Sequence, residues 1–340
     1  MEQIILFGAG NEGINALNFV PKEAIKYFVD NDCKKWGTSL MGVEIMAPSK
    51  LMGEKSSVYI TTSWKYISEI KEQLISIGIT NFNLFQDYNL RIKKKNKKLL
   101  SLKGKYAGKR CFLIGTGPSL KMEDLEKLKS NGEICFASNK IFKLYDKTDW
   151  RPNLYCISDL DVFHFYYDTI CNMETEHMFL VNIAGSKYKN TIDIGKLNSN
   201  NKYIFDILYE KRMNKENEFV PAFSIKPERY VVDGGITVTY SMLQFVYFLG
   251  FKEVYLLGID FSYGDLSGED KNKNDHFCTD YIATGEVVNY PKIKDSLEAY
   301  EVAEEFSLMN GFRIYNATRG GKLEVFERVD FDRLMEKELK

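Results

Sequence analysis

The residues best suited to chemistry follow a short apolar run, residues 111–114, which predicts a buried parallel strand. The run breaks into Gly115-Thr116-Gly117-Pro118-Ser119, and a helical pattern begins at Leu120. A strand, a glycine turn and a helix start direct backbone N–H groups and the positive end of a helix dipole at one spot, which suits a phosphate. Pro118 fits a first helical turn, and Ser119 can cap neighbouring N–H groups. The alternative is an ordinary turn in which the glycines only shape the loop.

Other polar residues follow further predicted strands. Asn139 follows the strand at 134–137, Asp159 and Asp161 follow 154–157, and Asp260-Phe261 closes the strand that starts at residue 253. The carboxyl ends of parallel strands share one edge of a sheet, where ligands bind, so we expect these residues to share a rim with residues 115–119. Gly234-Gly235, before the apolar helix predicted for 238–249, is a second place where backbone can approach an anion.

Histidine is the natural general base near neutral pH, and the chain has three: His164, His177 and His276. His276 lies in a loop after the Asp260 strand, beside the predicted rim. We therefore predict that His276 is the catalytic base. The alternative is a solvent-exposed loop histidine without a role.

A second glycine pattern opens the chain. Gly8, Gly10 and Gly13 form G-x-G-x-x-G between a strand at 4–7 and a helical pattern, and Asp30 lies at about the 20-residue offset of a carboxylate that binds a nucleotide ribose. The pattern is compatible with a mononucleotide or dinucleotide site. The alternative, a Rossmann-like scaffold with an empty pocket, is favoured because the region is short for a full dinucleotide domain.

The elements that position these residues alternate between strands and helices, which predicts an α/β protein with mainly parallel sheets in two Rossmann-like three-layer domains. We expect a small domain at 1–90, a solvated basic linker at 91–110, and a catalytic domain at 111–340. Residues 186–230 are polar and aromatic with weak periodicity, and we interpret them as a lid-like insertion.

The composition excludes several classes of protein. A net charge of −1 gives no indication of nucleic-acid binding. The six scattered cysteines form no CxxC pair, which favours reduced core thiols over disulfides or a zinc site. No signal peptide opens the chain, and no apolar run approaches the ~20 residues of a membrane span. We expect a cytoplasmic protein. The basic linker leaves open a peripheral contact with the inner face of the membrane.

The catalytic region resembles two related families. The segments LIGTGPSL (113–120), ASNKIF (137–142), GGITVTYSMLQFVYFLGFKEVYLLGIDF (234–261) and NDH (274–276) carry the resemblance, over about residues 109–320. One family is the Campylobacter-type bacterial sialyltransferases. The other is the MptE-like group, which includes flagellin-glycosylating motility accessory factors and archaeal hydroxymethyl-dihydropterin diphosphokinases. The ending NATRGGKLEVFERVDF (316–331) resembles the MptE-like group more closely. Residues 1–88 resemble the small Rossmann-like domains found on bacterial sugar-modifying enzymes.

The resemblance implies a glycosyltransferase that moves a sialic-acid-like (nonulosonic) sugar from a CMP donor to a surface-glycan acceptor. It implies inversion at the anomeric carbon, no metal and no required cofactor, with His276 deprotonating the acceptor. The donor would be held by Gly115, Thr116, Gly117, Pro118, Ser119, Asn139, Asp159, Gly234, Gly235, Thr237, Asp260 and Phe261.

Two alternatives stay open. A diphosphokinase that moves pyrophosphate from Mg-ATP to a pterin alcohol would use Asp159, Asp161 and Asp260 as metal ligands. No G-x-x-x-x-G-K-[ST] is present, so ATP would need another cradle. The other alternative is a non-catalytic nucleotide-sugar-binding subunit of a polysaccharide assembly.

Overall fold

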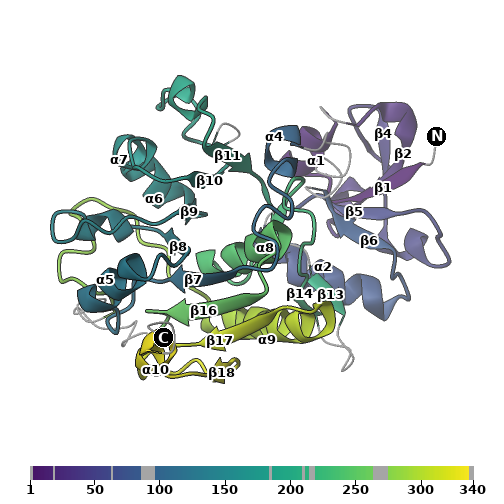
Figure 1. Cartoon of the computed structure of the whole chain (residues 1–340). Coiled ribbons are helices and arrows are strands. Elements are labelled where there is room, and N and C mark those ends of the chain that lie inside the picture. Colours follow the sequence, from purple (N-terminus) through teal and green to yellow (C-terminus); the bar gives the residue numbers. More distant parts are fainter. Residues whose placement is uncertain are drawn as a thin grey trace. The chain divides into compact units, whose positions relative to one another are not determined.

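The chain folds into two units, residues 1–94 and 95–340, in a computed structural model. The structure describes residues 3–17, 20–62, 64–85, 96–183, 186–208, 211–213, 219–262 and 275–336. Each unit is an α/β domain built on its own sheet (Figure 1). The predicted fold class, two Rossmann-like domains with mainly parallel sheets, is confirmed.

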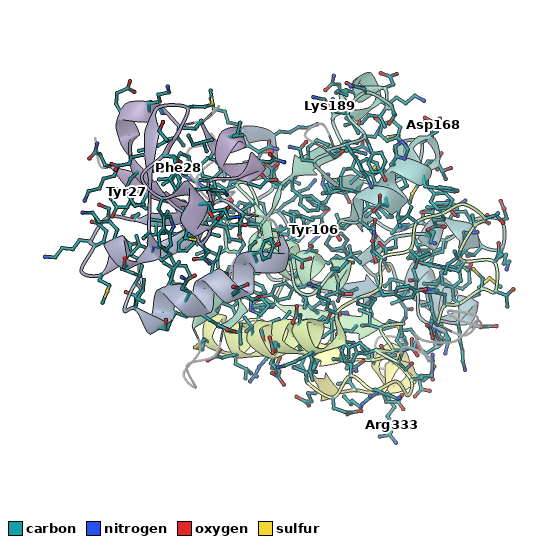
Figure 2. The ribbon with its side chains drawn as sticks, turned by 180° about the vertical axis from the view of Figure 1, so that it is seen from behind. Tyr27, Phe28, Tyr106, Asp168, Lys189 and Arg333 are labelled. Atoms are coloured by element: carbon teal, nitrogen blue, oxygen red, sulfur yellow. The ribbon has the colours of Figure 1, made fainter. Side chains whose placement is uncertain are left out.

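The first unit holds, in its described residues, a mixed six-stranded sheet of order β3-β4-β2-β1-β5-β6. Its strands are β1 (Ile4–Phe7), β2 (Ile25–Val29), β3 (Ser39–Leu40), β4 (Val43–Met46), β5 (Val58–Ile60) and β6 (Phe82–Leu84), with helices α1 (Asn11–Ala16) and α2 (Trp64–Ser76). Among the described strands of this sheet, β3 and β4 pair antiparallel and the other pairs are parallel. Apolar side chains form a separate core on each face of the sheet, with Phe28 in one and Tyr27 in the other (Figure 2). This alternation is what a buried strand with helices on both sides requires.

The second unit holds an eight-stranded sheet of order β11-β10-β9-β8-β7-β16-β17-β18, in which every pairing is parallel. The strands are β7 (Arg110–Ile114), β8 (Cys135–Ser138), β9 (Leu154–Ile157), β10 (His177–Val181), β11 (Lys202–Phe205), β16 (Glu253–Leu257), β17 (Arg313–Asn316) and β18 (Glu327–Arg328). The order runs outward from β7 to β11 on one side and starts again with β16 on the other. The crevice between the ends of β7 and β16 is therefore the topological switch point, where such sheets bind ligands.

The helices of this unit are α4 (Lys97–Leu100), α5 (Met122–Ser130), α6 (Leu160–Phe165), α7 (Tyr167–Cys171), α8 (Val238–Leu249), α9 (Ile293–Asn310) and α10 (Phe331–Glu336). The helix predicted for 238–249 is α8, and all its residues except Tyr247 are buried. It ends at Gly250, whose φ of 90° is the left-handed conformation that favours glycine at a helix end. Its continuous apolar surface packs α8 against β7, β8 and β9.

The segment predicted as a basic linker differs from that expectation. Residues 91–95 lie outside the described residues, but residues 96–110 belong to the second unit. Leu99, Leu102 and Tyr106 are buried in its core. Several of the basic side chains are also engaged: Lys98 donates to backbone carbonyls, Lys105 pairs with Glu176 at 3.1 Å, and Arg110 pairs with Glu133. The prediction of a solvated linker was based on the density of basic residues and did not consider the apolar residues spaced among them.

The segment 186–230, predicted as a lid, also differs from its expectation. Residues 209–210 and 214–218 of it lie outside the described residues. The segment supplies β11, an edge strand of the main sheet, and β13 (Lys211–Met213), which pairs with β14 (Phe219–Pro221). It also supplies β12 (Ile207–Leu208), which pairs with β15 (Val231–Val232) just beyond the segment. The buried Gln244 of α8 anchors the end of this segment, because its amide bonds Ser224 N–H and both backbone groups of Val232. Figure 2 shows that Lys189, by contrast, points outward.

The described helices include none that is long and apolar enough to span a membrane.

Candidate active site

A cavity of about 190 Å³ lies at the switch point of the second sheet. Its wall is formed by the loops after β7, β8, β9 and β16, by the N-terminus of α8 and by residues 275–291. Of the residues predicted to bind a donor, those that line this cavity are Gly115, Thr116, Gly117, Asn139, Asp159, Thr237, Asp260 and Phe261, and the predicted base His276 lines it too. The expected shared rim therefore exists. Pro118, Ser119, Gly234 and Gly235 lie outside the lining.

The glycine turn after β7 is shaped by contact with the loop after β16. A Cβ on Gly115 would lie 2.3 Å from the carbonyl oxygen of Gly258, and one on Gly117 would lie 2.0 Å from a carboxylate oxygen of Asp260. Gly115 donates its N–H to Leu257 O (2.8 Å), and Gly117 donates to Gly258 O (2.9 Å). Two of the N–H groups predicted to face a phosphate are thus already bonded. These glycines serve close packing of two loops, which a sequence pattern does not distinguish from a phosphate cradle.

Ser119 contacts Asp260 instead of capping a helix. Its hydroxyl donates to the Asp260 carboxylate at 2.9 Å, and its N–H lies 3.4 Å from the same oxygen. The helix begins only at Met122, so Pro118 and Ser119 belong to the turn and not to a first helical turn. Burial raises the pKa of Asp260, and the Ser119 hydrogen bonds oppose that rise. Asp260 therefore ties the two loops together while one side of it faces the cavity.

Backbone strain is concentrated at this cavity. The structure describes four non-glycine residues with left-handed φ, and three of them, Asn139 (49°), Ile236 (63°) and Phe261 (49°), line it. A β-branched residue such as Ile236 is strongly disfavoured there, and such strain is typical of functional sites. The side-chain oxygen of Asn139 is also buried without a hydrogen-bond partner in the described part of the chain. A ligand that donates a hydrogen bond would satisfy it.

One part of this wall with partial positive charge is the N-terminus of α8. Thr237 precedes the helix without capping it, because its hydroxyl pairs with Tyr300. The first N–H groups of a helix have no partner within it, so those of Val238 and Thr239 add a partial positive charge to the cavity wall. Gly234 and Gly235 were predicted to let the backbone approach an anion, but they pack closely against protein atoms instead. A Cβ on Gly234 would lie 2.6 Å from the Tyr240 ring, and one on Gly235 would lie 2.6 Å from Ser296 N.

His276 lies half-buried in the cavity wall, and its ring stacks on Tyr281 with centroids 3.6 Å apart. The Tyr281 hydroxyl donates to the Thr116 hydroxyl at 3.0 Å, and Phe277 N–H donates to Thr116 O at 3.1 Å. Burial, together with the charge of Lys140, lowers the pKa of His276 to about 4. The imidazole is therefore neutral at pH 7, as a base must be. The other histidines, His164 and His177, do not line this cavity.

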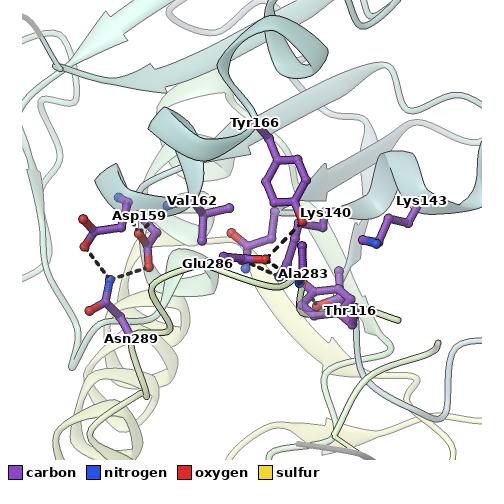
Figure 3. A network of polar contacts seen from close by, with 12 residues as sticks. Thr116, Lys140, Lys143, Asp159, Val162, Tyr166, Ala283, Glu286 and Asn289 are labelled. Atoms are coloured by element: carbon purple, nitrogen blue, oxygen red, sulfur yellow. Dashed lines mark hydrogen bonds and ion pairs between the residues drawn. The ribbon is translucent and has the colours of Figure 1, made fainter. Parts of the chain in front are cut away.

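The three carboxylates proposed as metal ligands are occupied by protein donors, and that of Asp260 accepts from Ser119 as described above. One oxygen of Asp159 accepts the N–H groups of Asp161 and Val162 at the start of α6. Asn289 donates to the other Asp159 oxygen and to Asp161, at 3.0 Å each (Figure 3). Asp161 also accepts from Tyr188 and pairs with Lys187 at 3.0 Å. The described residues contain no group of three or more His, Cys, Asp or Glu side chains placed to hold a metal ion.

Sequence reasoning missed the ion pair that Lys140, in this wall, forms with Glu286. Lys140 and Glu286 form an ion pair of 2.6 Å whose side chains are only 4% and 1% exposed. Lys140 directly follows Asn139, so the sequence could have placed it beside the rim, at the end of the same strand. Glu286 and Asn289 lie in a segment with no motif, and their sequence carried no such signal.

The glycine pattern of the first unit lines a separate cavity of about 550 Å³ with Gly8, Gly10 and Asp30 in its wall. Gly8 (φ 120°) and Gly13 are required by packing, because a Cβ would lie 2.2 Å from Thr61 O and 2.4 Å from Gly8 O respectively. The Asp30 carboxylate accepts Ala9 N–H (2.8 Å), Asp32 N–H and Lys35. A nucleotide at this cavity stays a prediction.

Two family models match the chain. The model described as "6-hydroxymethylpterin diphosphokinase MptE-like" matches residues 84–266, and the model "C2185-like, N-terminal" matches residues 1–84. A solved structure of a MAf glycosyltransferase from Magnetospirillum magneticum AMB-1 is similar at a TM-score of 0.40 and 12% identity. The match covers 99% of this chain and 60% of that one, so this chain spans less than two thirds of its length. No curated protein matches the sequence.

Proposed function

The chain belongs to the MptE-like family, whose model covers more than half of it, and we propose that it transfers a nonulosonic (sialic-acid-like) sugar from a CMP donor to a glycan hydroxyl. One observation carries this proposal. The cavity that gathers His276, the strained rim and the α8 N-terminus has a single cationic side chain in its described lining, Lys140, and Glu286 neutralises it. In such a wall the donor's single phosphodiester group would be held by the N–H groups at the start of α8, whereas a triphosphate beside Asp159, Asp260 and Asp275 would need bridging metal ions.

In this proposal, residues that line the cavity bind the donor phosphate and accept the acceptor proton. The anionic phosphate of the donor would lie at the Val238 and Thr239 N–H groups, where developing charge is stabilised by fixed dipoles. The acceptor oxygen forms a bond to the anomeric carbon as the bond to the phosphate oxygen breaks. The electron pair leaves with CMP, and the acceptor proton passes to His276. Attack opposite the leaving group inverts the anomeric centre.

The low pKa of His276 fits this sequence of events. An anion bound near an imidazole stabilises its protonated form and raises its pKa. Donor binding would thus strengthen a base that is neutral but weak in the empty cavity. General-base catalysis of this kind is typically worth ~10²–10⁴ in rate.

The second candidate is the diphosphokinase named in the family model. It is favoured by three aspartates in the lining, Asp159, Asp260 and Asp275, which a triphosphate could use only through bridging Mg²⁺. For Asp159 to ligate a metal, its bond to Asn289 would have to break. A third candidate is a nucleotide-sugar-binding subunit without catalysis.

Two experiments separate these functions. Thermal-shift measurements with CMP, CDP, UDP, ATP and NAD, each with and without Mg²⁺, should show stabilisation by CMP alone, independent of metal. Stabilisation by Mg-ATP alone would favour the kinase, and no response would favour the third candidate. His276→Ala should then lower turnover of CMP-Neu5Ac with an acceptor panel by ~10²–10⁴. Unchanged turnover would remove His276 from its role.

A further inference from the structure

Lys140, which forms a buried pair with Glu286, contacts the Tyr281 ring that stacks on His276, and the pair has no part in the transfer steps. Glu286 belongs to segment 275–291, whereas Lys140 follows β8, 146 residues earlier. The second carboxylate oxygen of Glu286 accepts from the Tyr166 hydroxyl (3.0 Å) and from Ala283 N–H (3.1 Å), as Figure 3 shows. Every charge in this cluster is therefore paired, which is the condition for burying an ion pair.

The pair reaches His276 through one aromatic ring. Lys140 Nζ lies 4.1 Å from the centroid of the Tyr281 ring, a cation–π contact. Tyr281 in turn stacks on His276, with an angle of 16° between the rings. An ammonium group, a phenol ring and an imidazole thus form one continuous contact, and the Thr116 hydroxyl fixes the far end of the phenol.

We propose that the Lys140–Glu286 ion pair supports the imidazole of His276 through the ring of Tyr281, and that Lys140 is a positioning residue of this cavity. The contact geometry carries the inference. The claim about imidazole placement does not depend on which substrate the cavity binds, while its consequence for turnover rests on the proposed function.

The electrostatic effect of the pair on His276 has a definite sign. Burial and the Lys140 charge lower the pKa of His276, whereas the Thr116 carbonyl, Asp275 and Glu286 raise it. Removing Lys140 should therefore raise this pKa. Removing the Glu286 charge should lower it, because the Lys140 charge is then uncompensated.

The chain offers a direct readout, because three histidines give a short set of imidazole NMR signals. In Lys140→Met, we expect the pKa of His276 to rise from about 4 by roughly one unit, a tenfold change in proton affinity. Glu286→Gln should shift it the other way. The matched control is Lys143→Met. It removes the ion pair of 3.2 Å between Lys143 and Asp280, which joins the same two segments but is partly exposed. It should leave the titration within about 0.3 units of wild type.

A double variant, Lys140→Met with Glu286→Leu, keeps the local net charge and avoids an unpaired buried ion. We expect it to fold and to lower kcat for CMP-Neu5Ac at least tenfold, with the KM of the donor unchanged. The inference is overturned if Lys140→Met leaves the His276 titration as in wild type, or if the double variant keeps wild-type kcat. If the NMR shifts appear while wild-type protein transfers no sugar, the proposed function fails and the support of His276 stands.

Discussion

Replacing Gly117 by alanine tests whether the two loops at the cavity need contact closer than any side chain allows. The added Cβ would lie 2.0 Å from Asp260 Oδ2 and 2.8 Å from Gly258 O. Forcing a methyl group into such a site typically costs ~1–3 kcal/mol. Moving the carboxylate away also weakens its hydrogen bond from Ser119, and bonds to charged groups contribute ~1.5–3 kcal/mol. We expect Gly117→Ala to lower the free energy of unfolding by about 2–4 kcal/mol.

Scanning calorimetry measures this cost when its transitions are assigned to the two units, residues 1–94 and 95–340, by comparison of the variants. For a unit of this size, 1 kcal/mol corresponds to ~2–4 °C, so the melting temperature of the second unit should fall by roughly 5–15 °C. Gly10→Ala is the matched control, because a Cβ there meets nothing within 4 Å. It should cost less than about 1 kcal/mol, the typical effect of alanine at a helix start.

A double-mutant cycle identifies the atom responsible. If the Asp260 carboxylate is the main obstacle, then Gly117→Ala should cost at least ~1 kcal/mol less in an Asp260→Ala background. The reasoning is refuted if Gly117→Ala alone costs under ~0.5 kcal/mol, or if the two substitutions are additive.

Two further outcomes follow from charges elsewhere in the fold. Arg319 donates hydrogen bonds to both carboxylate oxygens of Asp124, whose side chain is only 2% exposed. Arg319→Ala should therefore lower the free energy of unfolding, measured by calorimetry, by ~3–5 kcal/mol. A change below ~1 kcal/mol would contradict a buried ion pair there. Burial raises the pKa of Asp30, but its hydrogen bonds from Asp32 N–H, Lys35 and Ala9 N–H outweigh burial and lower it. Asp30 therefore stabilises the first unit above pH ~3.9, and this contribution is lost as the pH falls through its lowered pKa. Melting curves of wild type and Asp30→Asn should converge toward acid pH, and a constant gap between pH 7 and 3 would count against that assignment.

Local patterns in the chain were enough to predict the framework of this protein. Short apolar runs such as residues 111–114 are typical of central parallel strands, which are buried on both faces, and these runs alternate with helical patterns. The apolar helix 238–249 and its glycine end were readable because both depend on neighbouring residues alone. The shared rim followed as well, since parallel strands place their carboxyl ends at one edge.

Local patterns failed where the outcome depended on residues far apart in the chain. The charge run at 91–110 predicted a linker, but Leu99 and Tyr106 are buried in the core of the second unit, where burial of apolar surface outweighs the local charge. The wall of the cavity opposite the strand ends is segment 275–291, whereas the described part of 186–230 adds no residue to the lining.

The chemistry of the cavity was likewise decided by tertiary contacts. The sequence placed Gly115 and Gly117 in a turn, but it could not show that the carbonyl groups of Leu257 and Gly258 accept hydrogen bonds from their N–H groups. It named His276, but not the burial and the Lys140 charge that keep the pKa of its imidazole low. Spacing along the chain determines which strand ends share an edge; which donors are already bonded, and which charges face one another, is decided only when distant segments pack.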